Sequence, residues 1–169
     1  VMRAAEELVS LLKPACERTE IAGSLRRRRP LVGDIEIVAV PRLIRDLLGD
    51  PTDASELDLL LATMPIVLLK NGQKYKQFLY TDRAGAQYQI DLFLQPDPAT
   101  WGVNFMVRTG SAEFTRRMVT PKAWGGLQPA GLQVRDARVW RGPELLDTPE
   151  ETDVFELWGL QWIAPQERE

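Results

Sequence analysis

Hydrophobic and polar residues alternate along several stretches of the chain in the way that is typical of half-buried β-strands. These stretches are TEIAGS (19–24), GDIEIVAVP (33–41), IVLLKNGQKYKQFLYT (66–81) and AQYQIDLFLQP (86–96). Proline ends two of them, at Pro41 and Pro96. Asn71-Gly72 divides the 66–81 stretch into two extended runs, which predicts a β-hairpin. GGLQPAGLQVRDARVWRG (125–142) predicts a second, smaller hairpin region.

Other segments repeat their apolar residues at helical spacing. We predict helices within 2–18, within 54–64 after a cap at Ser55, within 103–119, and within 147–163. The third helix should break at Thr109-Gly110 and start again with Ser111 as its new cap. On the last helix Trp158 and Trp162 lie four residues apart, which predicts that both belong to the core.

Helices and strands interleave along the chain, and we expect the α+β fold class, with a mixed or antiparallel sheet flanked by helices and a small α/β subdomain after it. The segment DPATWG contains proline and glycine, which interrupt regular secondary structure, and the pattern of apolar residues changes after it. We therefore place the boundary near residue 102, which gives a first subdomain at 1–102 and a second at 103–169.

Composition narrows the functional classes. The chain has 169 residues, 44% hydrophobic and 27% charged, and no apolar run approaches the roughly 20 residues of a membrane span, so no membrane association is expected. A single cysteine, Cys16, excludes an internal disulfide and favours a reducing compartment, so we expect a cytoplasmic protein, or one of a host cytoplasm or virion if viral, that is not secreted. Cys16 is expected to be buried in the first helix.

The sequence contains no histidine, which excludes Ser-His-Asp and Cys-His triads and histidine zinc motifs. Any chemistry must use carboxylates, hydroxyls, lysine, arginine and a hard metal ion. The net charge of −3 argues against a uniformly basic nucleic-acid coat, although basic residues cluster locally. One cluster is Arg26–Arg29, and a second comprises Arg108, Arg116, Arg117 and Lys122.

Three acidic residues lie in apolar strand patterns: Asp34, Glu36 and Asp91. Residues two apart in a strand share a face about 6–7 Å apart, so Asp34 and Glu36 should point the same way, with Ile35 and Ile37 facing the core. Clustered carboxylates repel one another unless a cation pairs them, and Mg²⁺ or Mn²⁺ suits oxygen ligands. The alternative is that these acids occupy the solvated face of half-exposed strands.

Gly23-Ser24 favours the first interpretation. A Gly-Ser turn that opens a helical stretch offers N–H groups and a hydroxyl to a phosphate, and Arg27 could bind the phosphate oxygens in a forked geometry. Together with carboxylates ten residues later, the turn predicts a site for a metal-bound phosphate.

These blocks are recognisable together. GSLRRRRPLVGDIEIV resembles the GS-x-RR…GD-x-D segment of DNA polymerase family X, the polymerase beta-like branch of the nucleotidyltransferase superfamily. YQIDLFL resembles the family's strand with the third metal-binding acid, NFMVRTGSAEFTRRM resembles its F-TGS turn and following helix, and DVFELWGLQWIAPQERE resembles its closing segment. The resemblance covers nearly the whole chain as a palm plus a thumb.

The resemblance implies roles for particular residues. Asp34, Glu36 and Asp91 fall on the ligands of two Mg²⁺ or Mn²⁺ ions, with Asp91 also taking the proton of the primer 3′-hydroxyl. The nucleotide-binding positions are Gly23, Ser24, Arg27, Gly33, Thr109, Gly110, Ser111 and Thr115. The implied reaction is in-line attack of a 3′-hydroxyl on the α-phosphate of a nucleoside triphosphate, with release of pyrophosphate.

Several positions depart from the family's pattern. Glu36 stands where aspartate is usual, and one more methylene moves the carboxylate by roughly 1.5 Å. Gln89 stands where an arginine often precedes the last acid, and Val107-Arg108 replaces an aromatic pair, which puts discrimination against ribonucleotides in question. Ala112 and Thr115 replace polar residues that touch the base, which suggests loose or absent template reading.

The family's N-terminal helical DNA-binding and lyase domains are missing, so we expect either a fragment or a minimal viral-type or phage-type enzyme. As DNA-binding candidates we take Arg116, Arg117 and Lys122, with Lys74 and Lys76 as weaker ones; plain surface solubility is the alternative.

We expect a monomeric DNA polymerase that acts on a gapped or nicked primer–template. A template-independent or non-DNA nucleotidyltransferase, and a catalytically weak nucleic-acid-binding module, are the alternatives.

Overall fold

The computed structural model describes residues 1–169, which form two compact units. The first unit comprises Val1–Leu25 and Pro30–Pro96, and the second comprises Arg26–Arg29 and Asp97–Glu169. The expected boundary after residue 102 lies inside a helix, α4 (Trp101–Thr109), whereas the division in the structure falls at Pro96. None of the helices combines the length and the hydrophobicity that a membrane-spanning segment needs.

The first unit is built on a five-stranded mixed sheet with the order β1-β2-β7-β6-β5. The strands are β1 (Cys16–Ile21), β2 (Ile35–Pro41), β5 (Val67–Asn71), β6 (Tyr75–Thr81) and β7 (Gln87–Leu94). β2 and β7 run parallel, and the other neighbours run antiparallel. The predicted α+β class, with a mixed sheet flanked by helices, is therefore confirmed.

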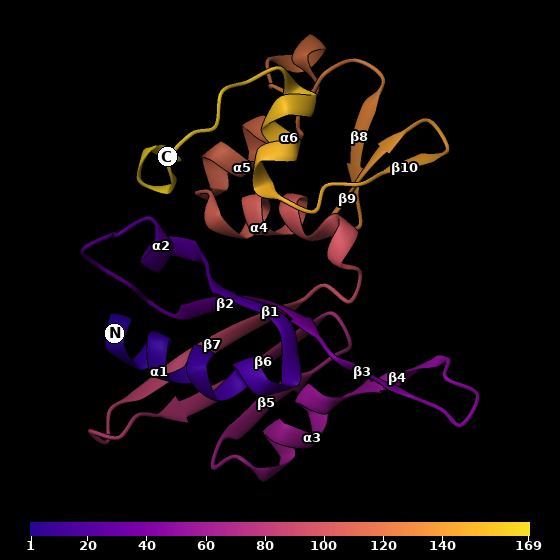
Figure 1. Cartoon of the computed structure of the whole chain (residues 1–169). Helices are drawn as coiled ribbons and strands as arrows, with labels where there is room; N and C mark the ends of the chain where they lie inside the picture. The colour runs from indigo at the N-terminus through magenta and orange to yellow at the C-terminus, as the bar shows by residue number, and fades with distance from the viewer. The chain divides into compact units, whose positions relative to one another are not determined.

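Two helices of the first unit, α1 (Met2–Leu12) and α3 (Glu56–Thr63), share one core with the sheet (Figure 1). Ile35 and Ile37 of β2 are fully buried in this core, as predicted. Other large members are Leu8, Leu12, Leu57, Phe78, Ile90 and Leu92. Since side chains alternate along a strand, the residues between these apolar positions point to the other face of the sheet.

The structure forms the helix cap and the hairpin that short sequence motifs predict in the first unit. Ser55 caps α3 as predicted, because its Oγ accepts a hydrogen bond from Asp58 N. The β5–β6 hairpin forms as predicted, but its turn lies further along the chain than Asn71-Gly72. Asn71 still pairs with Lys76, and Gly72 N donates to Tyr75 O at 2.9 Å, which leaves Gln73 and Lys74 in the turn.

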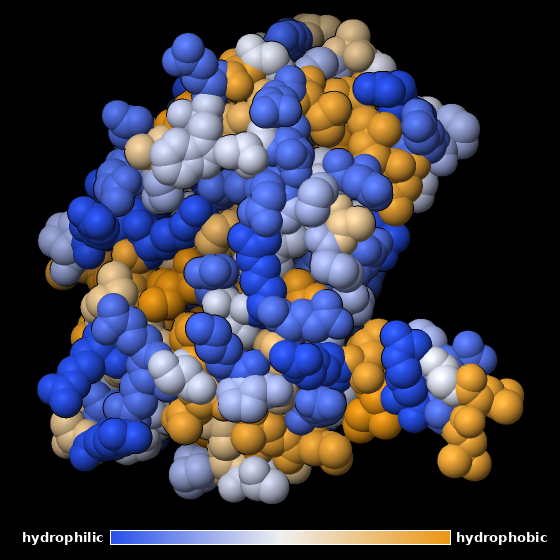
Figure 2. Space-filling model, viewed as in Figure 1, coloured by the Kyte–Doolittle hydropathy of each residue, from blue (hydrophilic) through white to orange (hydrophobic).

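A second hairpin, β3 (Leu43–Arg45) and β4 (Pro51–Ser55), forms its own two-stranded sheet. Leu47 and Leu48 at its tip are fully exposed, and Figure 2 shows hydrophobic colour at the end of this arm. The sequence pattern did not indicate this hairpin.

The second unit packs its helices with a three-stranded antiparallel sheet, β10-β9-β8 (Figure 1). Its helices are α4 (Trp101–Thr109), α5 (Ala112–Val119) and α6 (Glu151–Trp158), and its strands are β8 (Leu132–Arg135), β9 (Arg138–Arg141) and β10 (Glu144–Leu146). Short 3₁₀ helices lie at Pro98–Thr100, Lys122–Trp124 and Pro165–Glu167, and another, in the first unit, at Lys13–Ala15. The core includes Val103, Met106, Met118, Val139, Val154, Phe155 and Trp158.

The predicted terminal helix ends earlier than expected. Gly159, with φ +67°, closes α6 directly after Trp158 in the left-handed conformation that glycine tolerates. Trp158 is buried, and its Nε1 donates to Met118 O at 2.8 Å. Trp162 lies in the extended segment that follows and is 47% exposed, so the prediction that it belongs to a helix and to the core is wrong.

Cys16 is buried, as expected, but it opens β1 instead of lying in the first helix. Burial raises the pKa of its thiol. A protonated, buried thiol is a poor nucleophile, so Cys16 contributes to packing.

Candidate active site

Glu36 and Asp91 meet in the middle of the sheet of the first unit. β2 and β7 pair in parallel with Glu36 directly opposite Asp91, so both side chains leave the sheet on the face opposite to the buried Ile35 and Ile90. Both acids are partly buried. The strand pattern thus places two of the three predicted acids side by side.

Two residues of β6 hold the carboxylate of Asp91. Tyr75 Oη and Gln77 Nε2 donate hydrogen bonds to Asp91 Oδ1 at 3.0 and 2.9 Å. The ring of Tyr75 also stacks on Phe93, with 5.2 Å between ring centroids. Neither donor is among the residues predicted from the sequence, although Gln77 lies opposite Asp91 in the β6–β7 register. Their effect is to fix the orientation of the Asp91 carboxylate.

Asp34 lies in the bend just before β2, not within the strand as predicted, because β2 begins at Ile35. Strand alternation therefore does not determine where its side chain points. Burial, and then the negative charge of Asp91, raise the pKa of Asp34. Asp34 and Asp91 are thus close enough for their charges to repel each other.

Gly23 brings the predicted Gly-Ser turn against Glu36. Gly23 has φ +60°, and a Cβ built on it would lie 1.7 Å from Glu36 Oε2. The carboxylate of Glu36 therefore occupies the space that any other residue at position 23 would fill. Ser24 follows Gly23 in α2 (Gly23–Arg26) and is partly buried, and Gly33 has open space where its side chain would be.

A set of carboxylates suits a hard divalent cation, because carboxylate oxygens are the ligands that Mg²⁺ and Mn²⁺ prefer. Asp34, Glu36 and Asp91 are the residues that could hold such ions. No group of three or more His, Cys, Asp or Glu side chains in the structure converges tightly enough to form a ready metal site. The chemistry of these donors fits such an ion.

In the second unit, α4 ends at Thr109 and α5 begins after Ser111, as predicted. Ser111 Oγ accepts a hydrogen bond from Phe114 N at 3.0 Å and so caps α5. A Cβ on Gly110 would lie 2.4 Å from the Phe114 ring, which explains the glycine. Thr115 Oγ1 donates to Val107 O at 3.0 Å, so this hydroxyl ties α5 to α4.

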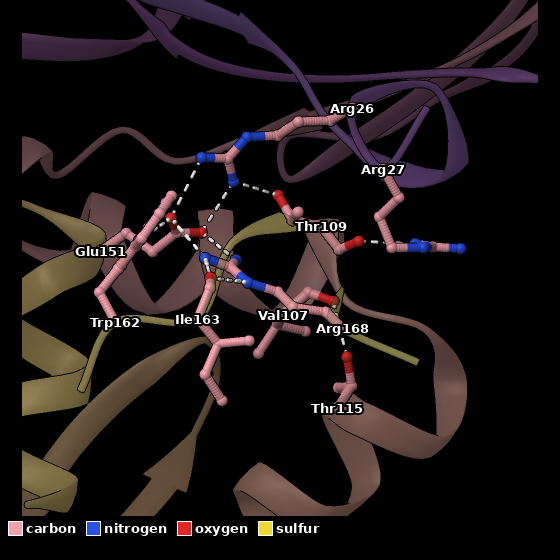
Figure 3. Close-up of polar contacts among 9 residues, drawn as sticks. All are labelled: Arg26, Arg27, Val107, Thr109, Thr115, Glu151, Trp162, Ile163 and Arg168. Carbon is pink, nitrogen blue, oxygen red and sulfur yellow. Dashed lines mark hydrogen bonds and ion pairs between the residues drawn. The ribbon is translucent and has the colours of Figure 1, made fainter. Parts of the chain in front are cut away.

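Arg27 reaches this same turn (Figure 3). Its Nη1 donates to Thr109 O at 2.6 Å, and its Nε lies 4.0 Å from Glu169 Oε1 and makes no hydrogen bond. Arg29 forms an ion pair with Glu169 as well. The guanidinium of Arg27 is therefore oriented by the end of α4 while part of its donor capacity is unused.

A buried ion cluster that the sequence analysis did not assign lies beside this turn (Figure 3). Arg168 Nη1 and Nη2 donate to the two carboxylate oxygens of Glu151 at 2.5 and 2.9 Å. Arg26 approaches the same carboxylate at 2.8 and 3.1 Å, and its Nη1 also donates to Thr109 Oγ1 at 2.6 Å. Trp162 Nε1 donates to Glu151 Oε2 at 3.0 Å, which accounts for its position outside the helix.

The electrostatics of Glu151 follow from this geometry. Burial alone would raise the pKa of its carboxyl, but the hydrogen bonds and charges of Arg168 and Arg26 outweigh that effect and lower the pKa to about 2. Arg168 is fully buried and also donates from Nε and Nη2 to Ile163 O at 2.9 and 2.7 Å. The cluster thus anchors the C-terminal segment and Arg26 to α6.

The predicted DNA contacts differ in exposure. Arg116 and Arg117 on α5, Lys122, and Lys74 in the β5–β6 turn are exposed. Lys76 is only 3% exposed, and its Nζ lies 2.7 Å from Asp58 Oδ1 and also bonds Asn71. A buried, paired ammonium does not reach a phosphate backbone, so the structure argues against a DNA contact at Lys76.

A comparison of the sequence with protein-family models and with curated proteins found no match.

Proposed function

We propose that the protein is a metal-dependent nucleotidyltransferase of the polymerase beta type, with the first unit as its palm, which adds deoxynucleotides to a DNA primer 3′-hydroxyl. The observation that carries the proposal is the pairing of Glu36 with Asp91 on one face of the sheet, next to an Asp34 whose pKa the Asp91 charge raises. Carboxylates concentrated in this way are costly unless cations neutralise them.

In the proposed reaction, Asp34, Glu36 and Asp91 would hold Mg²⁺ or Mn²⁺, which when bound would polarise the triphosphate and assist loss of the 3′-hydroxyl proton. The carboxylate of Asp91 would accept that proton. Tyr75 and Gln77 hold its Oδ1, so the whole carboxylate is oriented before substrate binds. Preorganised oxygens avoid reorganisation during the reaction.

In the first unit, Ser24 would bind phosphate oxygens of the nucleotide, and Gly33 would line that site. In the second unit, Arg27 would bind phosphate oxygens. Nη1 of Arg27 is occupied by Thr109 O and its Nε is buried, so a phosphate oxygen would bind at Nη2. Thr109 and Gly110, with Ser111, would contact the nucleotide sugar.

Template-independent transfer is the second candidate, and one contact favours it. Thr115 would touch the base, but its hydroxyl proton goes to Val107 O. Gln89 and Val107-Arg108 also depart from the polymerase pattern. A site that does not hydrogen-bond the base discriminates weakly between nucleotides.

Primer extension tests the proposal. Gapped DNA, nicked DNA and a single-stranded primer are each incubated with every nucleotide and with Mg²⁺ or Mn²⁺. We expect templated extension by the wild type and a loss of at least 100-fold in Asp91→Asn and Asp34→Asn, because each substitution removes a metal ligand. Asp53→Asn, at an exposed acid of β4, is the matched control and should keep the wild-type rate.

Extension without a template would replace the first candidate with the second. Binding of DNA with no extension under any condition would instead support a catalytically weak nucleic-acid-binding module. Wild-type rates in Asp91→Asn would remove the metal-dependent mechanism altogether.

A further inference from the structure

Trp124 is 80% exposed at the end of the short 3₁₀ helix Lys122–Trp124, and nothing in the proposed reaction uses it. An exposed indole does not contribute the free energy that burial of such a large apolar side chain would provide. Of the large hydrophobic residues in the second unit, only Trp124 and Trp162 are exposed, and Trp162 is tied to Glu151. Trp124 is therefore an isolated aromatic side chain on a polar surface.

The backbone beneath Trp124 is held in one shape. Lys122 N donates to Gln128 O at 2.9 Å, and Leu127 N donates to Arg117 O at 2.7 Å, which fastens both sides of the loop. Gly125 adopts φ +82°, and a Cβ on Gly126 would lie 1.9 Å from a backbone oxygen of the preceding segment. A preorganised loop presents its side chain to a ligand at little entropic cost.

The surrounding sequence is strongly basic. Residues 116–141 contain six basic residues and one acidic residue, Asp136. The basic residues are Arg116, Arg117, Lys122, Arg135, Arg138 and Arg141. The whole chain carries a net charge of −3, so this segment departs from the overall balance and has the charge that a phosphate backbone requires.

We propose that Trp124 is a stacking platform for a nucleobase of single-stranded nucleic acid, with Arg116, Arg117 and Lys122 contacting the flanking phosphates. An exposed aromatic side chain among cations is how proteins bind single strands without reading their sequence. A protein partner would require a contiguous apolar patch, and Trp124 has no exposed apolar neighbour of that kind.

The choice of partner rests on the proposed function, but the binding itself uses no carboxylate and no metal. The test is therefore made in EDTA and without nucleotide. Fluorescence anisotropy measures the affinity of a labelled oligothymidine, and of an abasic backbone of the same length, for the wild type, Trp124→Ala and Trp124→Phe.

Stacking and phosphate contacts give different signatures. We expect Trp124→Ala to bind oligothymidine roughly tenfold more weakly, with Trp124→Phe in between. The abasic strand should bind the wild type and Trp124→Ala equally. Lys122→Ala and Arg117→Ala should each flatten the dependence of log affinity on log salt by about 0.7, whereas Trp124→Ala leaves that slope unchanged.

Leu47→Ala, at an exposed leucine of the first unit, is the matched control and should bind as the wild type does. Urea unfolding midpoints establish that each variant is folded. Equal affinity of the wild type and Trp124→Ala for oligothymidine would overturn the platform, and so would an equal loss for the abasic strand. Since extension is not measured, inactivity in the polymerase assay leaves this result unaffected.

Discussion

The pKa of Asp34 is sensitive to the negative charge that gathers near it in the first unit. Burial and the charge of Asp91 raise its pKa, so the folded state binds a proton that the unfolded state has released. Stability is therefore lost as pH rises from the unfolded value, near 3.8, through the higher folded value. In EDTA we expect Asp34→Asn to be more stable than the wild type at pH 7, and the difference should vanish below that window. Urea unfolding followed by tryptophan fluorescence at several pH values measures both free energies.

A stabilising divalent ion would reverse that comparison, because the wild type keeps a ligand that the variant lacks. Adding Mn²⁺ should therefore stabilise the wild type more than Asp34→Asn. An Asp34→Asn protein that is less stable than the wild type in EDTA would show that Asp34 is satisfied by a contact other than a cation.

The pKa of Glu151 is lowered, so its contribution to stability depends on pH in the opposite direction to that of Asp34. Its pKa falls from 4.5 to about 2, so the stability it contributes is complete above the unfolded value and is lost as pH falls through the folded one. The shift corresponds to about 3 kcal/mol. Glu151→Gln removes the charge between two arginines, and we expect it to be less stable than the wild type by about 3–5 kcal/mol at pH 6. That gap should shrink by about 3 kcal/mol when pH falls to 2, as measured by urea unfolding.

The gap between wild type and Glu151→Gln is the useful quantity because other carboxyls titrate alike in both proteins. A gap that stays constant across this range would mean that the shift in the pKa of Glu151 is not a major source of stability. Glu113→Gln, at an exposed acid of α5, is the matched control and should follow the wild type.

The residues of the site differ in how far sequence could place them. Alternation along β2 and β7 predicts that Glu36 and Asp91 avoid the core, and that depends only on neighbouring residues. Whether they face each other depends on a parallel register that joins distant strands. The Arg26–Glu151 pair spans 125 residues, and no local pattern encodes such a contact. Arg168 lies in the closing segment DVFELWGLQWIAPQERE, for which the sequence predicted no partner.

At the scale of elements, caps were predictable and ends less so. Ser55 and Ser111 each begin a helix as predicted, because a cap involves only three or four consecutive residues. The end of α6 was missed because the helical pattern continues to Trp162, while Gly159 already takes the left-handed conformation. A tertiary bond from Trp162 to Glu151 accompanies the early end.

Ser111 belongs both to the proposed sugar-binding turn and to the cap of α5, and these roles can be separated. Ser111→Ala removes the acceptor for Phe114 N and should cost about 1 kcal/mol in urea unfolding. Ser111→Asp keeps a good cap and should recover most of that stability. Nucleotide affinity should fall in both variants. Ser111→Ala lacks the hydroxyl, and the carboxylate of Ser111→Asp repels the triphosphate. Full recovery of nucleotide affinity in Ser111→Asp would show that Ser111 acts only as the cap of α5.

Across the whole molecule, the two units have separate cores. One core lies within residues 4–94, and the other includes residues between 103 and 163. The predicted boundary followed the punctuation in DPATWG, but Trp101-Gly102 already belongs to α4, where a Cβ on Gly102 would lie 2.0 Å from Glu150 O. The inclusion of Arg26–Arg29 in the second unit depends on long-range bonds such as Arg26–Glu151 and could not be read from a linear pattern.

Separate cores predict separate responses to cavities. Leu8 in the first core and Met106 in the second are both fully buried, and truncating either to alanine should cost about 2–5 kcal/mol. If each unit opens as its own cooperative segment, Leu8→Ala should speed amide hydrogen exchange in β2 and β7 while α4 and α6 keep their protection, and Met106→Ala should do the reverse. Exchange measured by mass spectrometry at pH 7 resolves these elements, and Leu59→Ala, at an exposed position of α3, controls for substitution itself. Equal acceleration of exchange in both units by either substitution would instead mean that the chain unfolds as one cooperative body. The Glu151 cluster and the sheet carboxylates would then contribute to the same free energy of unfolding.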